Sequence, residues 1–149
     1  MDSSIVGGGY VVASRAGCLA DHGHYITASE IDADVGEQIN TGAPPIVEPG
    51  LESRFEEHVG ERIRATTEVE SISDTDVTFL TVQTPSSGDG MIDTKTLESA
   101  CRDVGGALAD KTAYHLVVVK STVLPVIAQE LLERAIAEAS GPDQDAEIG

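Results

Sequence analysis

The residues of this sequence whose types and spacing suit ligand chemistry are concentrated in its first thirty positions. Three consecutive glycines, Gly7, Gly8 and Gly9, follow the short apolar run 5–6, and an acid, Glu30, comes later. Gly7 permits a turn that a Cβ would block, and Gly9 lets backbone N–H groups approach a pyrophosphate closely. Glu30, about twenty residues on, can accept hydrogen bonds from the two hydroxyls of a ribose. The pattern predicts dinucleotide binding, although a glycine-rich turn alone is often only a turn.

The segment between the glycines and the acid has the pattern needed to position them. A helical pattern begins near Tyr10 and closes at Gly23, and a second strand-like run follows at Tyr25–Ala28. Strand, tight turn, helix, strand and acid in this order are typical of the opening βαβ unit of a dinucleotide-binding fold. The helix would point its positive end at the phosphates. Because positions 29–37 contain no Arg or Lys to meet a 2′-phosphate, the pattern favours NAD over NADP.

The rest of the chain alternates short apolar runs with helical patterns. After Glu30, we expect helices at 32–41, 51–59, 94–108 and 126–139, strands at 63–66, 77–82 and 114–119, and a brief helical turn at 68–72. This alternation predicts an α/β fold with a Rossmann-type, doubly wound parallel sheet. The strand at 114–119 is the most strongly apolar of the set.

Three loops would follow the carboxyl ends of strands in this sheet. They are the glycine turn at 7–9, Gln83-Thr84-Pro85, and Lys120-Ser121-Thr122. Ligands of such sheets bind at the carboxyl ends of the strands, near the point where the strand order reverses. We therefore expect the three loops to converge on one crevice. Taken alone, each of these Ser and Thr residues would more often be a plain strand-end or helix-capping hydroxyl.

The composition fits one globular domain with a strongly acidic surface. The chain has 149 residues, 40% of them hydrophobic, and 26 acidic against 9 basic residues give a net charge of −17. Such a surface would repel nucleic acid and anionic membranes. With no apolar run of membrane-spanning length and no basic leader, we expect a cytoplasmic protein. The acids are spread along the chain, which favours a halophilic, hydrated surface; an ordinary acidic protein is the alternative.

The cysteines and three of the histidines do not suggest a metal or acid–base site. Cys18 and Cys101 lie far apart without a C-x-x-C spacing, and we expect both to be small buried hydrophobic residues. His22 and His24 flank a turn, and His115 opens a strand. None of them has partners at metal-ligand spacing, so we predict no metal site.

With these motifs placed, the chain resembles the N-terminal, NAD-binding domain of the UDP-glucose/GDP-mannose dehydrogenase family, and the UDP-glucose 6-dehydrogenases most closely. The resemblance covers nearly the whole chain. Its segments are IVGGGYV, GCLADHGHYIT, INTGAPPIVEPGLE, RIRATT, VQTPSSGDGMID and VVVKSTVLP. EPGLE and KSTV are much more specific than G-x-G, and their order and spacing match the family.

The resemblance implies a reaction and a set of site residues. In this family the C6 alcohol of a nucleotide sugar is oxidised twice to a carboxylate with two NAD, through a thioester on a catalytic cysteine, for polysaccharide biosynthesis. Thr122 matches the family threonine whose hydroxyl helps to hold a water at the reaction centre, which makes it the implied catalytic residue. The implied cofactor-binding residues are Gly7, Gly8, Gly9, Tyr10, Val11, Glu30, Thr84, Ser121 and Thr122.

The sequence departs from the family pattern in three places. Val12 stands where the fingerprint has its third glycine, and its branched side chain is expected to push helix and strand apart or to crowd the cofactor. Val35 stands where many members place a basic residue near the adenosine ribose. The segment 125–128 replaces the usual Pro-Gly-Thr-Thr and loses a glycine and two hydroxyls.

The resemblance also implies that the chain is a fragment. The family's catalytic cysteine and its sugar-binding domain would lie beyond residue 149. We expect residues 1–140 to form the NAD-binding Rossmann domain, truncated before its last strand, and residues 141–149 to form a polar tail. The strand at 116–119 would then be an uncovered edge, open to a second copy or to a missing C-terminal part.

We therefore expect the chain to be the NAD-binding portion of an oxidoreductase and to be inactive alone. The resemblance implies that the full-length enzyme oxidises UDP-glucose to UDP-glucuronate with two NAD. A UDP-sugar would be a partner only in a full-length enzyme. One alternative is a stand-alone NAD-sensing regulatory module, which would account for the missing catalytic groups. The other is a decayed copy that binds no ligand, which is motivated by the valines at positions 12 and 126.

Overall fold

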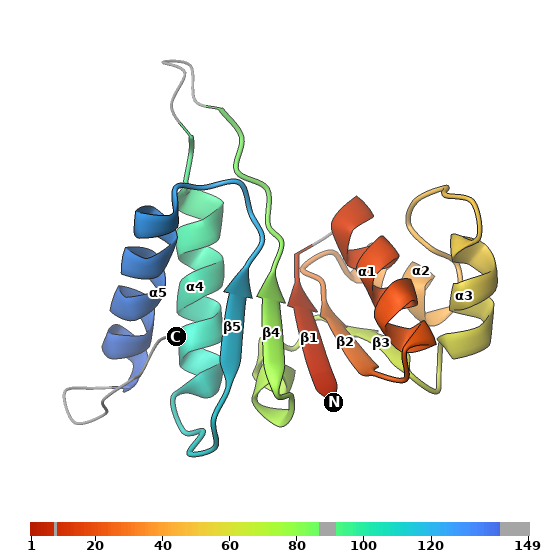
Figure 1. The fold of residues 1–149 in the computed structure, drawn as a ribbon, viewed down its shortest axis with the longest axis horizontal. Helices are drawn as coiled ribbons and strands as arrows, with labels where there is room; N and C mark the ends of the chain where they lie inside the picture. The colour runs from red at the N-terminus through yellow and green to blue at the C-terminus, as the bar shows by residue number, and fades with distance from the viewer. Residues whose placement is uncertain (8, 87–91, 141–149) are drawn as a thin grey trace.

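The fold is a five-stranded parallel sheet with helices against both faces (Figure 1). The computed structural model describes residues 1–7, 9–86 and 92–140. Gly8, the end of the polar loop at 87–91 and the predicted tail at 141–149 lie outside the described residues. The α/β class and the doubly wound sheet expected from the sequence are confirmed.

The elements follow the alternation that the sequence predicts. In chain order they are β1 (Asp2–Val6), α1 (Tyr10–Asp21), β2 (Tyr25–Ser29), α2 (Ala33–Asn40), α3 (Leu51–His58), β3 (Ile63–Thr66), the 3₁₀ helix η1 (Val69–Asp74), β4 (Val77–Leu80), α4 (Lys95–Leu108), β5 (Leu116–Val119) and α5 (Pro125–Ser140). The strand order is β3-β2-β1-β4-β5, and every pair is parallel. β5 is therefore an edge strand, as predicted.

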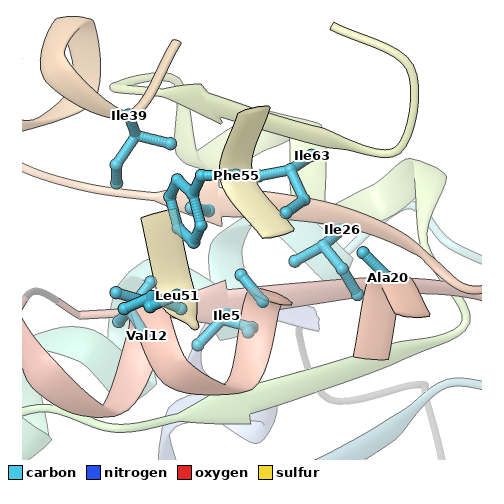
Figure 2. Packing of buried hydrophobic residues seen from close by; sticks show 11 residues of the cluster. Ile5, Val12, Ala20, Ile26, Ile39, Leu51, Phe55 and Ile63 are labelled. Atoms are coloured by element: carbon cyan, nitrogen blue, oxygen red, sulfur yellow. The ribbon is translucent and has the colours of Figure 1, made fainter. Parts of the chain in front are cut away.

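Both faces of β1 are buried, because successive side chains point to opposite faces of a strand. Ile5 packs in a cluster with residues of α1, α2 and α3, whereas Val6 packs in a second cluster with residues of α4 and α5. Figure 2 shows the first cluster, in which Leu51 and Phe55 of α3 join Ile26 of β2 and Ile63 of β3. The helices thus form two layers around β1, and this leaves the carboxyl ends of the strands at one common edge.

Val12 does not crowd the position of a ligand. Its side chain is 1% exposed and packs among Ile5 and Leu51 in the first cluster (Figure 2). A side chain with so little exposed surface offers nothing for a cofactor to meet, so that part of the expectation is wrong. Another glycine of α1, Gly17, lies close to α3, since an added Cβ would lie 3.1 Å from Leu51 Cδ1.

A buried histidine that the sequence analysis did not single out joins α1 to α3. His58 donates from Nε2 to Asp21 Oδ1 at 2.8 Å, and Arg54 Nε lies 2.7 Å from Asp21 Oδ2. The hydrogen bond from His58, with the charge of Arg54, lowers the pKa of the Asp21 carboxyl. The signal for His58 was its spacing: it follows the buried Phe55 by three residues on the apolar face of α3.

The two cysteines lie in different environments. Cys101 is 1% exposed in the second cluster, which confirms the prediction for it. The same prediction for Cys18 is wrong, because Cys18 is exposed. The buried residues of α1, among them Ala13, Ala16 and Ala20, follow helical spacing, and position 18 falls on the outer face.

Two further sequence expectations concern membranes and metals. In the described part of the chain, no helix combines the length and apolar character needed to cross a membrane. Among the same residues, no three His, Cys, Asp or Glu side chains gather as a metal-binding group.

Candidate functional site

Gly7 forms a turn that joins the carboxyl ends of three strands. Its φ is +125°, a conformation that residues with a side chain rarely adopt, and its N–H donates to the carbonyl oxygen of Ser29 at 3.2 Å. An added Cβ would lie 3.0 Å from the backbone carbonyl and from the hydroxyl of Thr81. Thr81 in turn donates from Oγ1 to Val6 at 3.1 Å. Glycine is required here because β1, β2 and β4 crowd together at this edge.

Gly9 precedes α1 and faces open space. Its φ is +79° and its ψ is −144°, a region that is essentially restricted to glycine, and no heavy atom lies within 4 Å of an added Cβ. As the N-cap, Gly9 has no side chain to accept hydrogen bonds from the first turn, and that turn contains no acidic residue. The amino terminus of α1 therefore suits an anion such as a pyrophosphate, which can approach without meeting a side chain at this position.

Glu30 holds a buried carboxylate at the end of β2. The residue is 5% exposed, and its N–H donates to the carbonyl oxygen of Thr66 at 3.0 Å. Oε1 accepts a hydrogen bond from the Asp32 N–H at 3.2 Å, whereas Oε2 is buried and has no partner among the described residues. A buried carboxylate oxygen without a partner is costly, and ribose hydroxyls are suitable donors for it. This observation fits a ribose at the predicted position.

The loops after β4 and β5 are joined by side-chain hydroxyls. Thr84 donates from Oγ1 to the carbonyl oxygen of Thr122 at 2.9 Å, and Ser121 donates from Oγ to the carbonyl oxygen of Val82 at 2.7 Å. Thr122 itself is exposed. The three predicted hydroxyl residues of these loops therefore lie together.

The predicted site residues thus fall on one edge of the sheet. Gly7, Gly9 and Glu30 lie at the ends of β1 and β2, and Thr84 and Thr122 follow β4 and β5; Figure 1 shows the loops after β1, β4 and β5 along its upper side. Val11 is exposed at the start of α1, and the described structure includes the backbone of Tyr10 there. Gly8 lies outside the described residues.

Thr81 is the residue of this edge that the sequence analysis missed. Both its hydroxyl and its backbone lie against Gly7. A polar residue at the end of the apolar run 77–80 was the available signal, but a threonine is also common inside strands.

At two positions where the sequence departs from the family pattern, the side chains are apolar valines. Val35 is half-buried and packs against the first cluster, and Val126 at the start of α5 is 66% exposed. Neither side chain can supply a hydrogen bond to a ribose or a nicotinamide.

A separate hollow lies at the opposite edge of the sheet. It has a volume of about 400 Å³ and is lined by residues at the amino ends of β1, β2 and β3, among them Tyr25, Arg62 and Arg64. None of the predicted site residues lines it. Residues that line this hollow therefore serve as controls for the predicted site at the carboxyl edge.

Residues 1–149 match the NAD binding domain of the UDP-glucose/GDP-mannose dehydrogenase family. The chain belongs to this family. UDP-glucose 6-dehydrogenase AglM of Haloferax volcanii is 45% identical over 141 residues, which are 95% of this chain and 33% of the relative. GDP-mannose 6-dehydrogenase of Azotobacter vinelandii is 42% identical over 151 aligned positions, which are 100% of this chain and 35% of the relative. The chain therefore spans about a third of the length of these relatives.

Solved structures of the same family share the fold. A ternary complex of GDP-mannose dehydrogenase from Pseudomonas aeruginosa superposes with a TM-score of 0.89 at 39% identity, over 95% of this chain and 33% of that chain. A UDP-glucose dehydrogenase from Pyrobaculum islandicum gives a TM-score of 0.87 at 37% identity, over 94% of this chain and 33% of that chain. The chain is the NAD-binding domain of a nucleotide-sugar dehydrogenase family, and its cofactor is NAD.

Proposed function

We propose that this chain binds NAD along the carboxyl edge of the sheet and serves as the cofactor-binding portion of a nucleotide-sugar 6-dehydrogenase. The observation that carries the proposal is Glu30 Oε2, a buried carboxylate oxygen with no partner among the described residues. It lies at the end of β2, beside the glycine turn after β1. In this fold, that position belongs to the ribose of the adenosine half.

The residues take distinct roles in this proposal. Backbone N–H groups of the Gly7–Val11 segment hold the pyrophosphate at the amino terminus of α1, and Glu30 accepts from the adenosine ribose. Thr84, Ser121 and Thr122 form the other half of the crevice, next to the nicotinamide. When bound, NAD supplies the acceptor for a hydride. In this proposal, Thr122 Oγ1 helps to hold a water at the reaction centre, as the family resemblance implies.

The chain is proposed to be inactive alone. The family chemistry needs a nucleophilic cysteine, but Cys101 is buried and Cys18 lies in the outer face of α1, away from the carboxyl edge. Residues 1–140 are proposed to form the cofactor-binding Rossmann domain, with the tail 141–149 outside it. The sugar nucleotide would meet residues outside this chain. UDP-glucose is the first candidate for the parent enzyme and GDP-mannose the second, since relatives of both names match at similar identity.

Calorimetry on three proteins tests the proposal. Glu30→Gln should weaken NAD binding about ten- to hundredfold, since a hydrogen bond to a charged group contributes about 1.5–3 kcal/mol. The matched control is Glu61→Gln, the same change at an exposed residue that lines the hollow at the opposite edge. Wild type should bind NAD more tightly than NADP.

Three results would contradict the proposal. They are equal NAD affinity in wild type and Glu30→Gln, an equal loss in Glu61→Gln, or NADH production from UDP-glucose or GDP-mannose by the chain alone. Binding of NAD only at millimolar levels or weaker would instead support a decayed copy.

A further inference from the structure

One face of the sheet is incompletely covered over β2 and β3. Ile26 and Ile63 belong to the first cluster, beneath α1 and α3, so their strand neighbours Thr27 and Arg64 lie on the opposite face. On that face, α4 and α5 pack in the second cluster, and the connection from β3 to β4 contributes only the six residues of η1. Parallel sheets are normally covered on both faces. The hollow of about 400 Å³ at the amino ends of β1, β2 and β3 lies on this incompletely covered face.

Two guanidinium groups line the hollow, and neither is paired with a carboxylate of the described residues. Arg64 Nε donates to Thr27 Oγ1 at 3.0 Å, and the Arg62 guanidinium lies over the ring of Tyr25, 5.6 Å from its centroid. Neither arginine has an ion pair in the described part of the chain, although 26 acidic residues face 9 basic ones in the sequence. Arg102, in contrast, pairs with a glutamate of its own helix. Uncharged partners therefore hold both side chains, and N–H groups of both remain available to an anion.

The rest of the lining adds an aromatic ring and three carboxylates. Tyr25 is 52% exposed, and Asp2, Glu61 and Asp74 also line the hollow. An exposed ring offers an apolar surface against which the C–H face of a sugar can pack, and carboxylate oxygens accept hydrogen bonds from hydroxyl groups. An anion without hydroxyl groups would be attracted by the arginines but repelled by the acids. The combination therefore matches a ligand that carries one carboxylate and several hydroxyl groups.

We propose that this hollow binds a sugar acid of the hexuronic acid class, a pyranose ring that carries one carboxylate. Arg62 and Arg64 hold the carboxylate, since the planar guanidinium fork suits its two oxygens. The acidic residues accept from the ring hydroxyls, and Tyr25 packs against the ring. The volume of the hollow falls in the range of about 300–1,000 Å³ that is usual for small-molecule sites. This inference does not depend on NAD binding, which is proposed for the other edge of the sheet.

Titrations of the ¹⁵N-labelled chain with three small ligands test the inference on wild type. Galacturonate has the carboxylate and the hydroxyl groups, galactose has the hydroxyl groups without the carboxylate, and acetate has a carboxylate alone. Galacturonate should shift the amides of Thr27, Arg62 and Arg64 and leave that of Gly9 unchanged. Galactose and acetate should each bind at least about tenfold more weakly, because each lacks one set of the hydrogen bonds.

Two substitutions in the hollow and one outside it locate the site. Arg62→Gln and Arg64→Gln each remove a guanidinium and should weaken galacturonate binding about ten- to hundredfold, as expected for a hydrogen bond to a charged group. Arg102→Gln removes an exposed guanidinium on α4 and should leave that affinity unchanged. All three variants should bind NAD as wild type does, because the hollow lies at the opposite edge from the carboxyl ends of the strands.

Several results would overturn the inference. They are no shift with galacturonate, equal affinity for galacturonate and acetate, equal affinity for galacturonate and galactose, or an equal loss in Arg102→Gln. Tighter binding of inorganic phosphate than of galacturonate would make the hollow a phosphate site, and competition by NAD for the same amides would make it a nucleotide site; either would overturn the assignment. If galacturonate bound and NAD did not, the proposed function would fail and this inference would stand.

Discussion

Replacement of single glycines by alanine separates the cost of an unusual backbone conformation from the need for a ligand to approach. Gly9 and Gly60 both have positive φ, +79° and +83°, and neither has a heavy atom within 4 Å of an added Cβ. Gly9 lies at the amino terminus of α1, and Gly60 lines the hollow at the opposite edge of the sheet. Each alanine variant should therefore lose about 1–3 kcal/mol of unfolding free energy through backbone strain alone.

Only the Gly9→Ala protein should also lose affinity for NAD. The new methyl would occupy the open space through which a pyrophosphate approaches the first turn of α1. Loss of one hydrogen bond to the charged diphosphate, at about 1.5–3 kcal/mol, corresponds to a dissociation constant about ten- to hundredfold larger. Gly60→Ala should bind NAD as wild type does.

A third variant should show the largest loss of unfolding free energy of the three. In Gly7→Ala the methyl would lie 3.0 Å from the backbone carbon and oxygen of Thr81, which cannot move aside as a flexible side chain can. This variant should be destabilised more than either of the others. Denaturant titrations give the stabilities and calorimetry gives the affinities. If Gly9→Ala bound NAD as tightly as Gly60→Ala, the placement of the pyrophosphate would be refuted.

Three further predictions concern the rest of the molecule. Burial and the charge of Lys111 lower the pKa of His115, so the unfolded chain takes up a proton near pH 6.5 before the folded one does. The free energy of unfolding should therefore fall as the pH drops below 6.5, and the fall should be smaller in His115→Gln. The same fall in the variant as in wild type would contradict this. Burial raises the pKa of Cys101 to about 11, so a thiol reagent at pH 8 should modify Cys18 alone in the native protein and both thiols after denaturation, whereas rapid native reaction of both would refute the packing. With a net charge of −17, the protein should melt at a higher temperature in molar salt than in dilute buffer, and the reverse order would exclude salt adaptation.

Most of the architecture follows from the sequence, because apolar periodicity and turn residues act locally. The start of α1 after the glycines and the cap of α2 by Asp32 needed no knowledge of the tertiary fold. The errors arose where packing between distant segments decides. Val12 takes the place of a glycine, and its side chain is buried in the same cluster as Leu51 of α3. No local pattern predicts that packing.

The candidate site shows the same limit. The sequence could assign Thr84 and Ser121 to the crevice, since both follow strands of the sheet. It could not show that their hydroxyls are used between loops, because the partners are backbone carbonyls 38 or 39 residues away. Nor could it show that one oxygen of Glu30 is held by Asp32 and the other has no partner among the described residues.

An NMR titration of the ¹⁵N-labelled chain with NAD tests the central claim most directly. The claim is that the loops after β1, β2, β4 and β5 form one cofactor site at the carboxyl edge. Amide shifts should change at Gly7, Gly9, Glu30 and Thr122 and should stay constant at Arg62, in the hollow at the opposite edge. Changes confined to the amino ends of the strands, or none at saturating NAD, would contradict the account.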